Sequence, residues 1–316
     1  MIRYGIIGTG SIAQKFKLAI ERSGVSELEA VCSRDLDRAR AFGAPQAYDS
    51  LDDMLKSPRV DCVYVATPHP LHFEQSKQSL LAGKPVLCEK PAVLRRAHMV
   101  ELADISRRTG TLFVEALWTR FLPVVQTVKS WLGEIGSVRA LTASFSFNTR
   151  FDPSSRLFAP ALGGGALYDV GVYVLGFAQY MLGGRHDEIA GLSHLAPTGV
   201  DDYAAMVVRF GEAIASLQCG TQVKQPEEAH IFGTTGRVEI PAPFWCARSA
   251  RLINANGEVV REVSDPQDHG WTHEAAYMAN LVSAGAKESP DMGLDDSVWL
   301  TEVYETLRNR WGLPEA

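Results

Sequence analysis

Ile2-Arg3-Tyr4-Gly5-Ile6-Ile7-Gly8-Thr9-Gly10-Ser11-Ile12-Ala13 is an apolar strand pattern that runs into Gly-x-Gly-x-x-Ala and then into a helical pattern. This order is typical of the start of a dinucleotide-binding domain. Gly8 permits a tight turn, Gly10 lets backbone N–H groups approach a pyrophosphate, and small Ala13 allows close packing of helix on strand. We therefore expect a nucleotide site lined by Gly8, Thr9, Gly10, Ser11 and Ile12.

Predicted strands and helices alternate from this turn to residue 116. The helices expected from apolar periodicity are Ser11–Ser23, Asp35–Phe42, Asp49–Lys56, Pro70–Ala82 and Arg95–Arg108. The strands expected between them are Leu28–Ser33, Val60–Ala66, Pro85–Cys88 and Thr111–Ala116. Such alternation predicts an α/β domain of the Rossmann type, a doubly wound parallel sheet covered by helices on both faces.

The pattern changes beyond Arg120, where several strand-like runs follow one another without helices between them. The expected strands are Val138–Asn148, Ile189–Leu195, Tyr203–Phe210, Ile214–Cys219 and Arg237–Ile240. Helical segments are expected at Val124–Leu132, Ala166–Leu182, Thr272–Ser283 and Asp296–Arg310. We predict a dinucleotide-binding domain over residues 1–120 and an α+β substrate-binding domain with a large, mostly antiparallel open sheet over residues 121–316.

Composition limits the function classes. The formal net charge of −6 and the absence of a Lys/Arg block argue against a nucleic-acid partner. We see no apolar run near the roughly 18 residues that a membrane span needs, so we expect no membrane partner. The start shows no signal-peptide pattern, which predicts a cytoplasmic protein. The five cysteines are scattered and odd in number, and we expect buried thiols without disulfide or zinc.

The segment Tyr203–Phe210 shows little polar alternation, which suggests that this strand is buried on both sides. Self-association through the C-terminal sheet is the simplest cover for its second face, so we expect a homodimer or a higher homo-oligomer. The alternative is that the C-terminal helices of the same chain cover it.

The residue that ends the second strand of a dinucleotide domain reads the adenosine ribose, and an acid there favours NAD. Here the segment is Cys32-Ser33-Arg34. The Ser33 hydroxyl and the planar guanidinium of Arg34 suit a 2′-phosphate, so we predict NADP as the cofactor. NAD is the alternative, with Asp35 and Asp37 as the ribose partners.

Further motifs, in this order along the chain, resemble the glucose-fructose oxidoreductase/inositol dehydrogenase/MocA family. They are Ala66-Thr67-Pro68-His69-Pro70-Leu71-His72, Glu89-Lys90-Pro91, Glu115-Ala116-Leu117-Trp118-Thr119-Arg120-Phe121-Leu122-Pro123 and Gly163-Gly164-Gly165-Ala166-Leu167-Tyr168-Asp169-Val170-Gly171-Val172-Tyr173. The last is similar to the subgroup of dimeric dihydrodiol dehydrogenases and NADP-linked aldose (xylose) dehydrogenases. The resemblance implies an NAD(P)-dependent dehydrogenase that acts on CH–OH donors.

The resemblance also implies roles in the cofactor site. Lys90 follows Glu89 and is joined to Pro91 by a bond that is usually cis in the family. Lys90 is expected beside the nicotinamide, and Glu89 in the same cofactor site, since ligands of such sheets bind at the carboxyl ends of the strands. The same resemblance sets Thr67, His69 and His72 under the nicotinamide ribose, and Trp118 and Arg120 near the nicotinamide and substrate. Trp118 has simple core packing as its alternative. We expect no metal site, because His69 and His72 have no third ligand in view.

Asp169 and Tyr173 are four residues apart and share a face if Ala166–Leu182 is helical. We predict Tyr173 as the acid/base, Lys90 as its electrostatic partner, and Asp169 as the group that orients Lys90 or a substrate hydroxyl. A free tyrosine has a pKa of about 10, and a neighbouring ammonium favours the phenolate. The alternative makes Tyr173 a packed aromatic and Asp169 a helix cap.

Two substrate classes fit, an aldose oxidised at C1 or related polyol and a trans-dihydrodiol. Hydroxyl partners for a sugar are available from Asn148, Arg150, Asp152 and Arg156, and apolar partners for a dihydrodiol from Phe145, Phe147, Phe151 and Tyr168. The sequence analysis favours the sugar slightly. A non-catalytic NAD(P)-binding sensor or co-regulator is the alternative from another class, and the presence of Lys90, Asp169 and Tyr173 argues against it.

Overall fold

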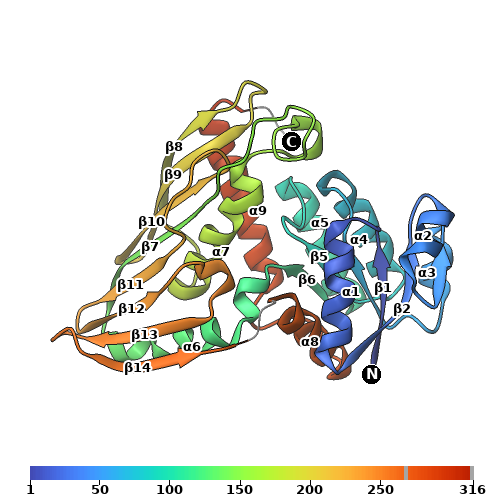
Figure 1. Ribbon diagram of the computed structural model, residues 1–316, viewed down its shortest axis with the longest axis horizontal. Helices are drawn as coiled ribbons and strands as arrows, with labels where there is room; N and C mark the ends of the chain where they lie inside the picture. The colour runs from blue at the N-terminus through green and yellow to red at the C-terminus, as the bar shows by residue number, and fades with distance from the viewer. Residues whose placement is uncertain (267–269, 314–316) are drawn as a thin grey trace. The chain divides into compact units, whose positions relative to one another are not determined.

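The computed structural model describes residues 1–266 and 270–313. Two compact units make up the chain: Met1–Trp118 with His269–Thr301, and Thr119–Asp268 with Glu302–Ala316. Figure 1 follows the chain through both units. Helix α9 (Leu294–Arg310) contributes its first part to the first unit and its second part to the other.

The first unit is built on a six-stranded sheet in the order β3-β2-β1-β4-β5-β6, and every pair of neighbours is parallel. The strands are β1 (Ile2–Ile7), β2 (Ser26–Cys32), β3 (Gln46–Tyr48), β4 (Cys62–Val65), β5 (Val86–Glu89) and β6 (Phe113–Ala116). The helices are α1 (Ser11–Ser23), α2 (Leu36–Phe42), α3 (Leu51–Lys56), α4 (His72–Leu81), α5 (Arg96–Thr109) and α8 (Gly270–Ser283).

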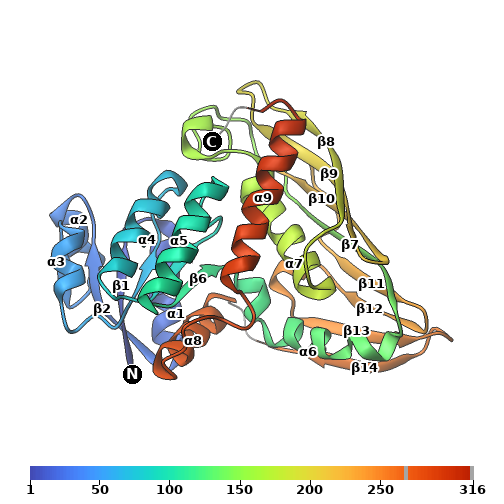
Figure 2. The same cartoon turned by 180° about the vertical axis from the view of Figure 1, so that it is seen from behind.

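Helices cover both faces of this sheet: Figures 1 and 2 show α1 and α8 on one face and α4 and α5 on the other. Strands β4, β5 and β6 are therefore buried throughout. Helix α1 docks through Phe16, whose ring stacks on Tyr64 with centroids 3.7 Å apart and meets Tyr4 edge-on at 5.5 Å. The predicted doubly wound parallel sheet is confirmed.

The first unit also includes α8, which lies within the range that the sequence analysis gave to the second domain. Helix α8 packs along α1, and the Tyr4 hydroxyl donates a hydrogen bond of 2.9 Å to the carbonyl oxygen of Ala275. Leu294 and Val298 at the start of α9 are buried in the same core as β4 and β5. Residues that follow the second domain in sequence thus complete the core of the first.

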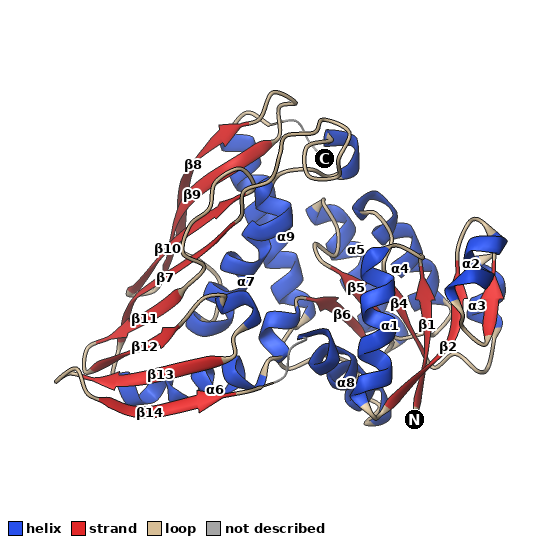
Figure 3. Ribbon diagram, in the orientation of Figure 1, coloured by secondary structure: helices blue, strands red, loops and turns tan. Residues whose placement is uncertain are grey.

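The second unit carries an eight-stranded sheet in the order β14-β13-β12-β11-β7-β10-β9-β8. Its strands, drawn red in Figure 3, are β7 (Val138–Ser146), β8 (Glu188–Leu195), β9 (Asp201–Phe210), β10 (Ala213–Gly220), β11 (Ala229–Gly233), β12 (Gly236–Ile240), β13 (Ser249–Asn254) and β14 (Val259–Ser264). Only the β7–β10 pair is parallel among these described strands. The mostly antiparallel sheet is therefore confirmed.

One face of this sheet carries the helices α6 (Pro123–Trp131) and α7 (Val172–Leu182) and the end of α9, as Figures 1 and 2 show. The end of α9 is tied to β8 by Trp311, whose indole N–H donates to the carbonyl oxygen of Gly191 at 2.9 Å. On the other face Val207 is 49% and Leu192 is 81% exposed. Strand β9 alternates buried and exposed residues, so within the single chain it is not buried on both sides as its sequence suggested.

The apolar segment Pro160–Leu182 corrects the expectation that no run approaches the length of a membrane span. By length and composition it could cross a membrane, but 89% of its 18-residue apolar window (mean hydropathy 1.3) is buried inside the protein. Helix α7 and the turn before it are buried nearly all round beneath β7 and β10, which explains their uniform hydrophobicity. This is how the core helix of a globular fold behaves.

Candidate active site

The glycine turn between β1 and α1 has the geometry that a dinucleotide requires. Gly8 has φ of +111°, its N–H donates to the carbonyl oxygen of Cys32 at 2.8 Å, and a Cβ there would lie 2.8 Å from the carbonyl oxygen of Ala66. A Cβ on Gly10 would meet nothing within 4 Å, and no side chain caps the start of α1. The backbone N–H groups of Ser11 and Ile12 thus begin a helix whose positive end is open to a diphosphate, and the turn, including Thr9, fits the cofactor.

Two of the cationic side chains that follow β2 make no ion pair with the acids near them in sequence. Asp35 caps α2 by accepting from the N–H groups of Asp37 and Arg38 at 2.9 and 3.1 Å, and Asp37 pairs with Arg40 at 3.3 Å. Arg34 and Arg38 make no ion pair with a described carboxylate. Both acids considered as ribose partners are thus engaged, whereas Arg34 and Arg38, which follow Ser33 in the sequence, have no such ion pair.

His72 fixes the loop after β4 and is completely buried. Its Nδ1 lies 3.0 Å from the carbonyl oxygen of Pro91 and its Nε2 lies 2.7 Å from that of Thr67. Burial holds the pKa of His72 below its ordinary value, although both carbonyl contacts favour the charged ring. His72 therefore connects the Thr67 turn to the Lys90-Pro91 turn, while the half-buried His69 ring lies 5.6 Å from it.

The turn that carries Lys90 is held by two buried carboxylates. Glu89 accepts from the Tyr64 hydroxyl and, at 3.1 Å, from the N–H of Lys90. Glu115 on β6 accepts from the N–H of Ala92 at 2.9 Å. The Lys90–Pro91 bond is cis, as the resemblance implied. Glu115 belongs to one of the sequence motifs, and the structure makes it a support of the lysine turn.

A third acid, Glu274 on α8, was missed by the sequence analysis. It is completely buried, and neither carboxylate oxygen has a hydrogen-bond partner. Burial first, and then the charge of Glu89, raise its pKa well above the ordinary value. Burial thus favours the neutral form of Glu274 in the folded protein.

Trp118, expected near the nicotinamide or in the core, is packed against the start of α8. Its ring stacks on Trp271 with centroids 5.2 Å apart, and a Cβ on Gly270 would lie 1.5 Å from Cε3 of Trp118. Only glycine at 270 allows this contact. The Trp118 ring, 4% exposed, is therefore held by neighbours within its own unit.

Arg120 lies in the second unit and is completely buried. Its guanidinium donates to the carbonyl oxygen of Gly176 at 2.9 Å and to the side chain of Gln179 at 2.5 Å. Both acceptors are on α7. These bonds anchor the helix that carries Tyr173.

The segment with Asp169 and Tyr173 begins as a π-helical turn (Leu167–Gly171) that continues into α7. Asp201 of β9 accepts from the N–H of Leu167 at 2.6 Å and so fixes the start of this turn. Burial raises the pKa of Asp201 to about 6 despite that bond. Asp169, almost buried, accepts from Arg156 at 2.8 Å. The sequence analysis noted Arg156 as a sugar partner but missed its ion pair with Asp169.

Tyr173 lies among aromatic side chains. The ring of Phe145 on β7 is 5.3 Å from Tyr173 and stacks on Trp245 at 4.6 Å with nearly parallel planes. The Trp245 indole N–H donates to Glu227 at 3.0 Å, and its carbonyl oxygen accepts from the Thr119 hydroxyl at 2.7 Å. Trp245 was not singled out from the sequence.

No group of three or more His, Cys, Asp or Glu side chains able to hold a metal ion occurs within residues 1–266 and 270–313. The five cysteines are free thiols, and four of them, all but Cys246, are buried.

Two family models match the chain, one in its N-terminal part and one in its C-terminal part. Residues 2–116 match the model of the oxidoreductase family with an NAD-binding Rossmann fold, and residues 125–239 match the GFO/IDH/MocA C-terminal domain. The chain belongs to the Gfo/Idh/MocA oxidoreductase family. It is therefore an enzyme with an NAD(P)-binding Rossmann domain, which leaves no place for the sensor alternative.

Individual relatives cover nearly the whole chain. Trans-1,2-dihydrobenzene-1,2-diol dehydrogenase of Homo sapiens is 32% identical over 329 residues, which are 99% of this chain and 97% of the relative. The Danio rerio protein of the same name is 31% identical over 329 residues, which are again 99% of this chain and 97% of that protein. Among solved structures, KijD10, a 3-ketoreductase from Actinomadura kijaniata in complex with NADP and TDP-benzene, is 27% identical with a TM-score of 0.83 and covers 98% of this chain and 97% of its own.

Replacing Glu274 by Gln tests the buried acid. Since its pKa is raised in the folded state, the folded protein binds a proton that the unfolded chain has lost, and this contribution to stability falls as pH rises above about 4.3. Gln stays neutral, so the variant should melt at a higher temperature than the wild type at pH 8, with the difference shrinking towards pH 5. Melting curves at both pH values check this, with exposed Glu21→Gln as control. A difference that does not depend on pH contradicts the assignment.

Proposed function

We propose that the protein is an NADP-dependent dehydrogenase of trans-dihydrodiols, cyclic vicinal diols with an apolar ring. The aromatic cluster around Tyr173 carries this proposal. Phe145, Phe147 and Trp245 give the surroundings of Tyr173 flat, apolar surfaces, and aromatic rings pack favourably on such surfaces. The relatives named above as trans-dihydrodiol dehydrogenases support the same choice.

The polar groups considered for a sugar are partly engaged elsewhere. Arg156 is paired with Asp169, and Asp152 accepts from the backbone N–H and the hydroxyl of Ser154 at 2.9 and 2.7 Å. A sugar site needs several convergent hydrogen-bonding groups to be selective. The slight preference for a sugar is therefore reversed here. Oxidation of an aldose at C1 remains the second candidate, favoured by the polar Arg156–Asp169 pair.

Two of the four apolar residues that were considered as partners for a dihydrodiol do not belong to the Tyr173 cluster. Tyr168 is fully buried edge-on to Tyr304 at 5.3 Å, and Phe151 packs on Phe158 at 5.0 Å in a separate cluster. Phe145 and Phe147 are the two members of the set that belong to the Tyr173 cluster.

NADP is preferred over NAD because of the charges at the end of β2. An NAD site needs a carboxylate for the ribose hydroxyls, but Asp35 and Asp37 are occupied by the N-cap of α2 and by Arg40. Arg34 and Arg38 offer two planar forks for a 2′-phosphate. The similarity to KijD10, solved with NADP, is in keeping with this choice.

When bound, NADP⁺ supplies a nicotinamide ring that accepts a hydride. The protein's task is to take the hydroxyl proton, which we assign to Tyr173. The ammonium of Lys90 would favour the phenolate of Tyr173 and polarise the substrate oxygen. Asp169, held by Arg156, would orient the second hydroxyl. Glu89, Glu115 and His72 keep the Lys90 turn in one conformation.

We further propose a cytoplasmic homodimer formed through the exposed face of the second sheet. Its apolar part comprises Leu192, Val207, Ile214 and Phe232. Pairs of both signs surround this part, such as Arg209 with Glu188 and Arg237 with Glu239. Apolar side chains among balanced charges make a surface complementary to itself, so a second copy of this chain fits it.

Replacing Tyr173 by Phe should lower kcat for trans-1,2-dihydrobenzene-1,2-diol by about a hundredfold or more, because the proton acceptor is lost. The Kd for NADPH should stay within about twofold. The measurement is NADP⁺ reduction by this diol and by a panel of aldoses. Tyr203→Phe removes a hydroxyl of the same unit as control. If the wild type turns over only aldoses, the substrate class is the sugar and not the diol. If kcat is unchanged in the Tyr173 variant, Tyr173 is not the proton acceptor.

Replacing Arg34 and Arg38 by Ala should raise KM for NADP⁺ at least tenfold and leave KM for NAD⁺ nearly unchanged, because only the 2′-phosphate loses its partners. Steady-state kinetics with both cofactors measure the ratio. Arg40→Ala is the matched control on the same helix. If KM rises equally for NADP⁺ and NAD⁺, the arginines contact a part of the nucleotide that both cofactors share.

Replacing Val207 by Lys should convert the dimer into a monomer, because the symmetric interface would bury two uncompensated ammonium groups. Sedimentation velocity gives the mass. Val259→Lys, an equally exposed valine on the edge strand β14, is the control. A wild type that sediments as a monomer contradicts the proposal, as does a Val207 variant that remains dimeric.

A further inference from the structure

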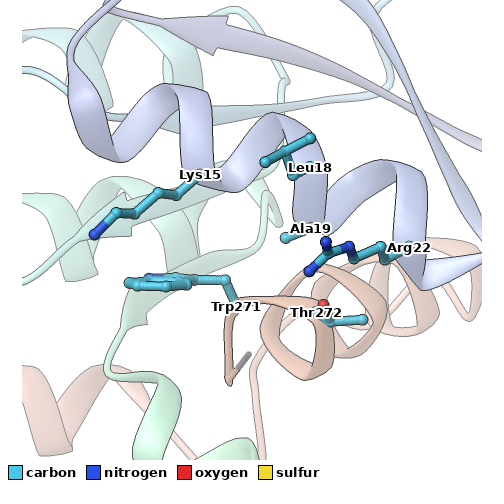
Figure 4. A pocket seen from close by; sticks show the side chains of 6 residues that line it. All are labelled: Lys15, Leu18, Ala19, Arg22, Trp271 and Thr272. Atoms are coloured by element: carbon cyan, nitrogen blue, oxygen red, sulfur yellow. The ribbon is translucent and has the colours of Figure 1, made fainter. Parts of the chain in front are cut away.

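A groove in the first unit lies between α1 and the beginning of α8 (Figure 4). Lys15, Leu18, Ala19 and Arg22 of α1 recur at intervals of three and four and so line one side. Trp271 and Thr272 of α8 line the other. The cavity of about 220 Å³ has room for a single ring with a small substituent.

The middle of the groove is apolar and fixed in shape. Ala19 and Thr272 are buried, whereas Leu18 is 51% exposed. The Trp271 ring is kept in place by its stack on Trp118 at 5.2 Å. An apolar ligand therefore finds a formed surface that needs no rearrangement.

The ends of the groove are cationic. Lys15 Nζ lies 5.0 Å from the Trp271 ring, and Figure 4 shows Arg22 reaching over Thr272. Seven residues of helix separate these cations by about 10 Å. Neither pairs with a carboxylate among the described residues, whereas Arg3 and Arg107 of the same unit have Asp61 and Asp295. The partial negative charge at the carbonyl end of α1 stabilises the cation of Arg22. Lys15 lies nearer the positive end of the helix, which does not stabilise a cation.

We propose that this groove binds a small aromatic carboxylate. The ring would occupy the apolar middle beside Leu18 and Trp271. The carboxylate would accept two hydrogen bonds from the planar Arg22 guanidinium and one from the Thr272 hydroxyl, with Lys15 adding charge from the other end. The apolar surface selects against a bare inorganic anion, and the cations select against a neutral ring.

Calorimetric titration of the full chain with benzoate tests the site. Benzoate should bind saturably, whereas benzamide, which has no charge, and sulfate, which has no ring, should bind at least about tenfold more weakly. Arg22→Ala should weaken benzoate by a similar factor and Lys15→Ala by a smaller one, whereas Lys56→Ala, which removes a cation elsewhere on the same unit, should leave the affinity unchanged. The indole N–H signal of Trp271, identified with Trp271→Phe, should shift on titration.

The titration tests the groove independently of the proposed activity, because binding is measured without turnover. Retained NADPH binding shows that the Arg22 and Lys15 variants are folded. Absence of saturable binding, benzamide binding as well as benzoate, or variants that bind like the wild type would each overturn the proposal.

Discussion

The chemistry of the first unit depends on hydrogen bonds that hold the Lys90 turn from three sides. Glu89 takes the N–H of Lys90 itself, Glu115 takes the N–H of Ala92, and His72 reaches the carbonyl oxygen of Pro91. All three side chains are at most 9% exposed, so each bond forms where water does not compete. A flexible lysine thereby starts from a rigid backbone, which suits the role that we propose for Lys90 beside the cofactor and the substrate.

The elements of this unit were predictable because their signals are local. The glycine turn, the alternation of apolar runs and the positions of the motifs at strand ends are all visible within about ten residues. Strand β3 was missed because three residues give no periodicity. In the second unit the short strands β11 and β13 were missed, as was β14, most of whose side chains are exposed. The place of α8 in the first core was not predictable, since it depends on a contact between Tyr4 and Ala275, 271 residues apart.

The same limit explains which candidate site residues could be named from the sequence. Lys90, Asp169 and Tyr173 belong to recognisable motifs, but the partners that hold them do not. Asp201, which fixes the start of the Tyr173 helix, and Glu274, a buried acid beside the Glu89 strand, are ordinary acidic residues in sequence. Only their burial in the folded chain distinguishes them, and burial of a single acid leaves no mark on a sequence pattern.

In the second unit the two faces of one sheet serve different purposes, and strand register links them. On β7, Phe145 points to the α7 side and packs on Tyr173, while the neighbouring Ser144 points to the exposed side. The parallel pairing of Ser144 with Gln218 and Phe145 with Cys219 continues this division into β10. A slip of one residue would exchange the faces, placing the aromatic surface outside and polar side chains beside Tyr173. The parallel β7–β10 pair therefore maintains both the aromatic surroundings of Tyr173 and the face available to a second copy.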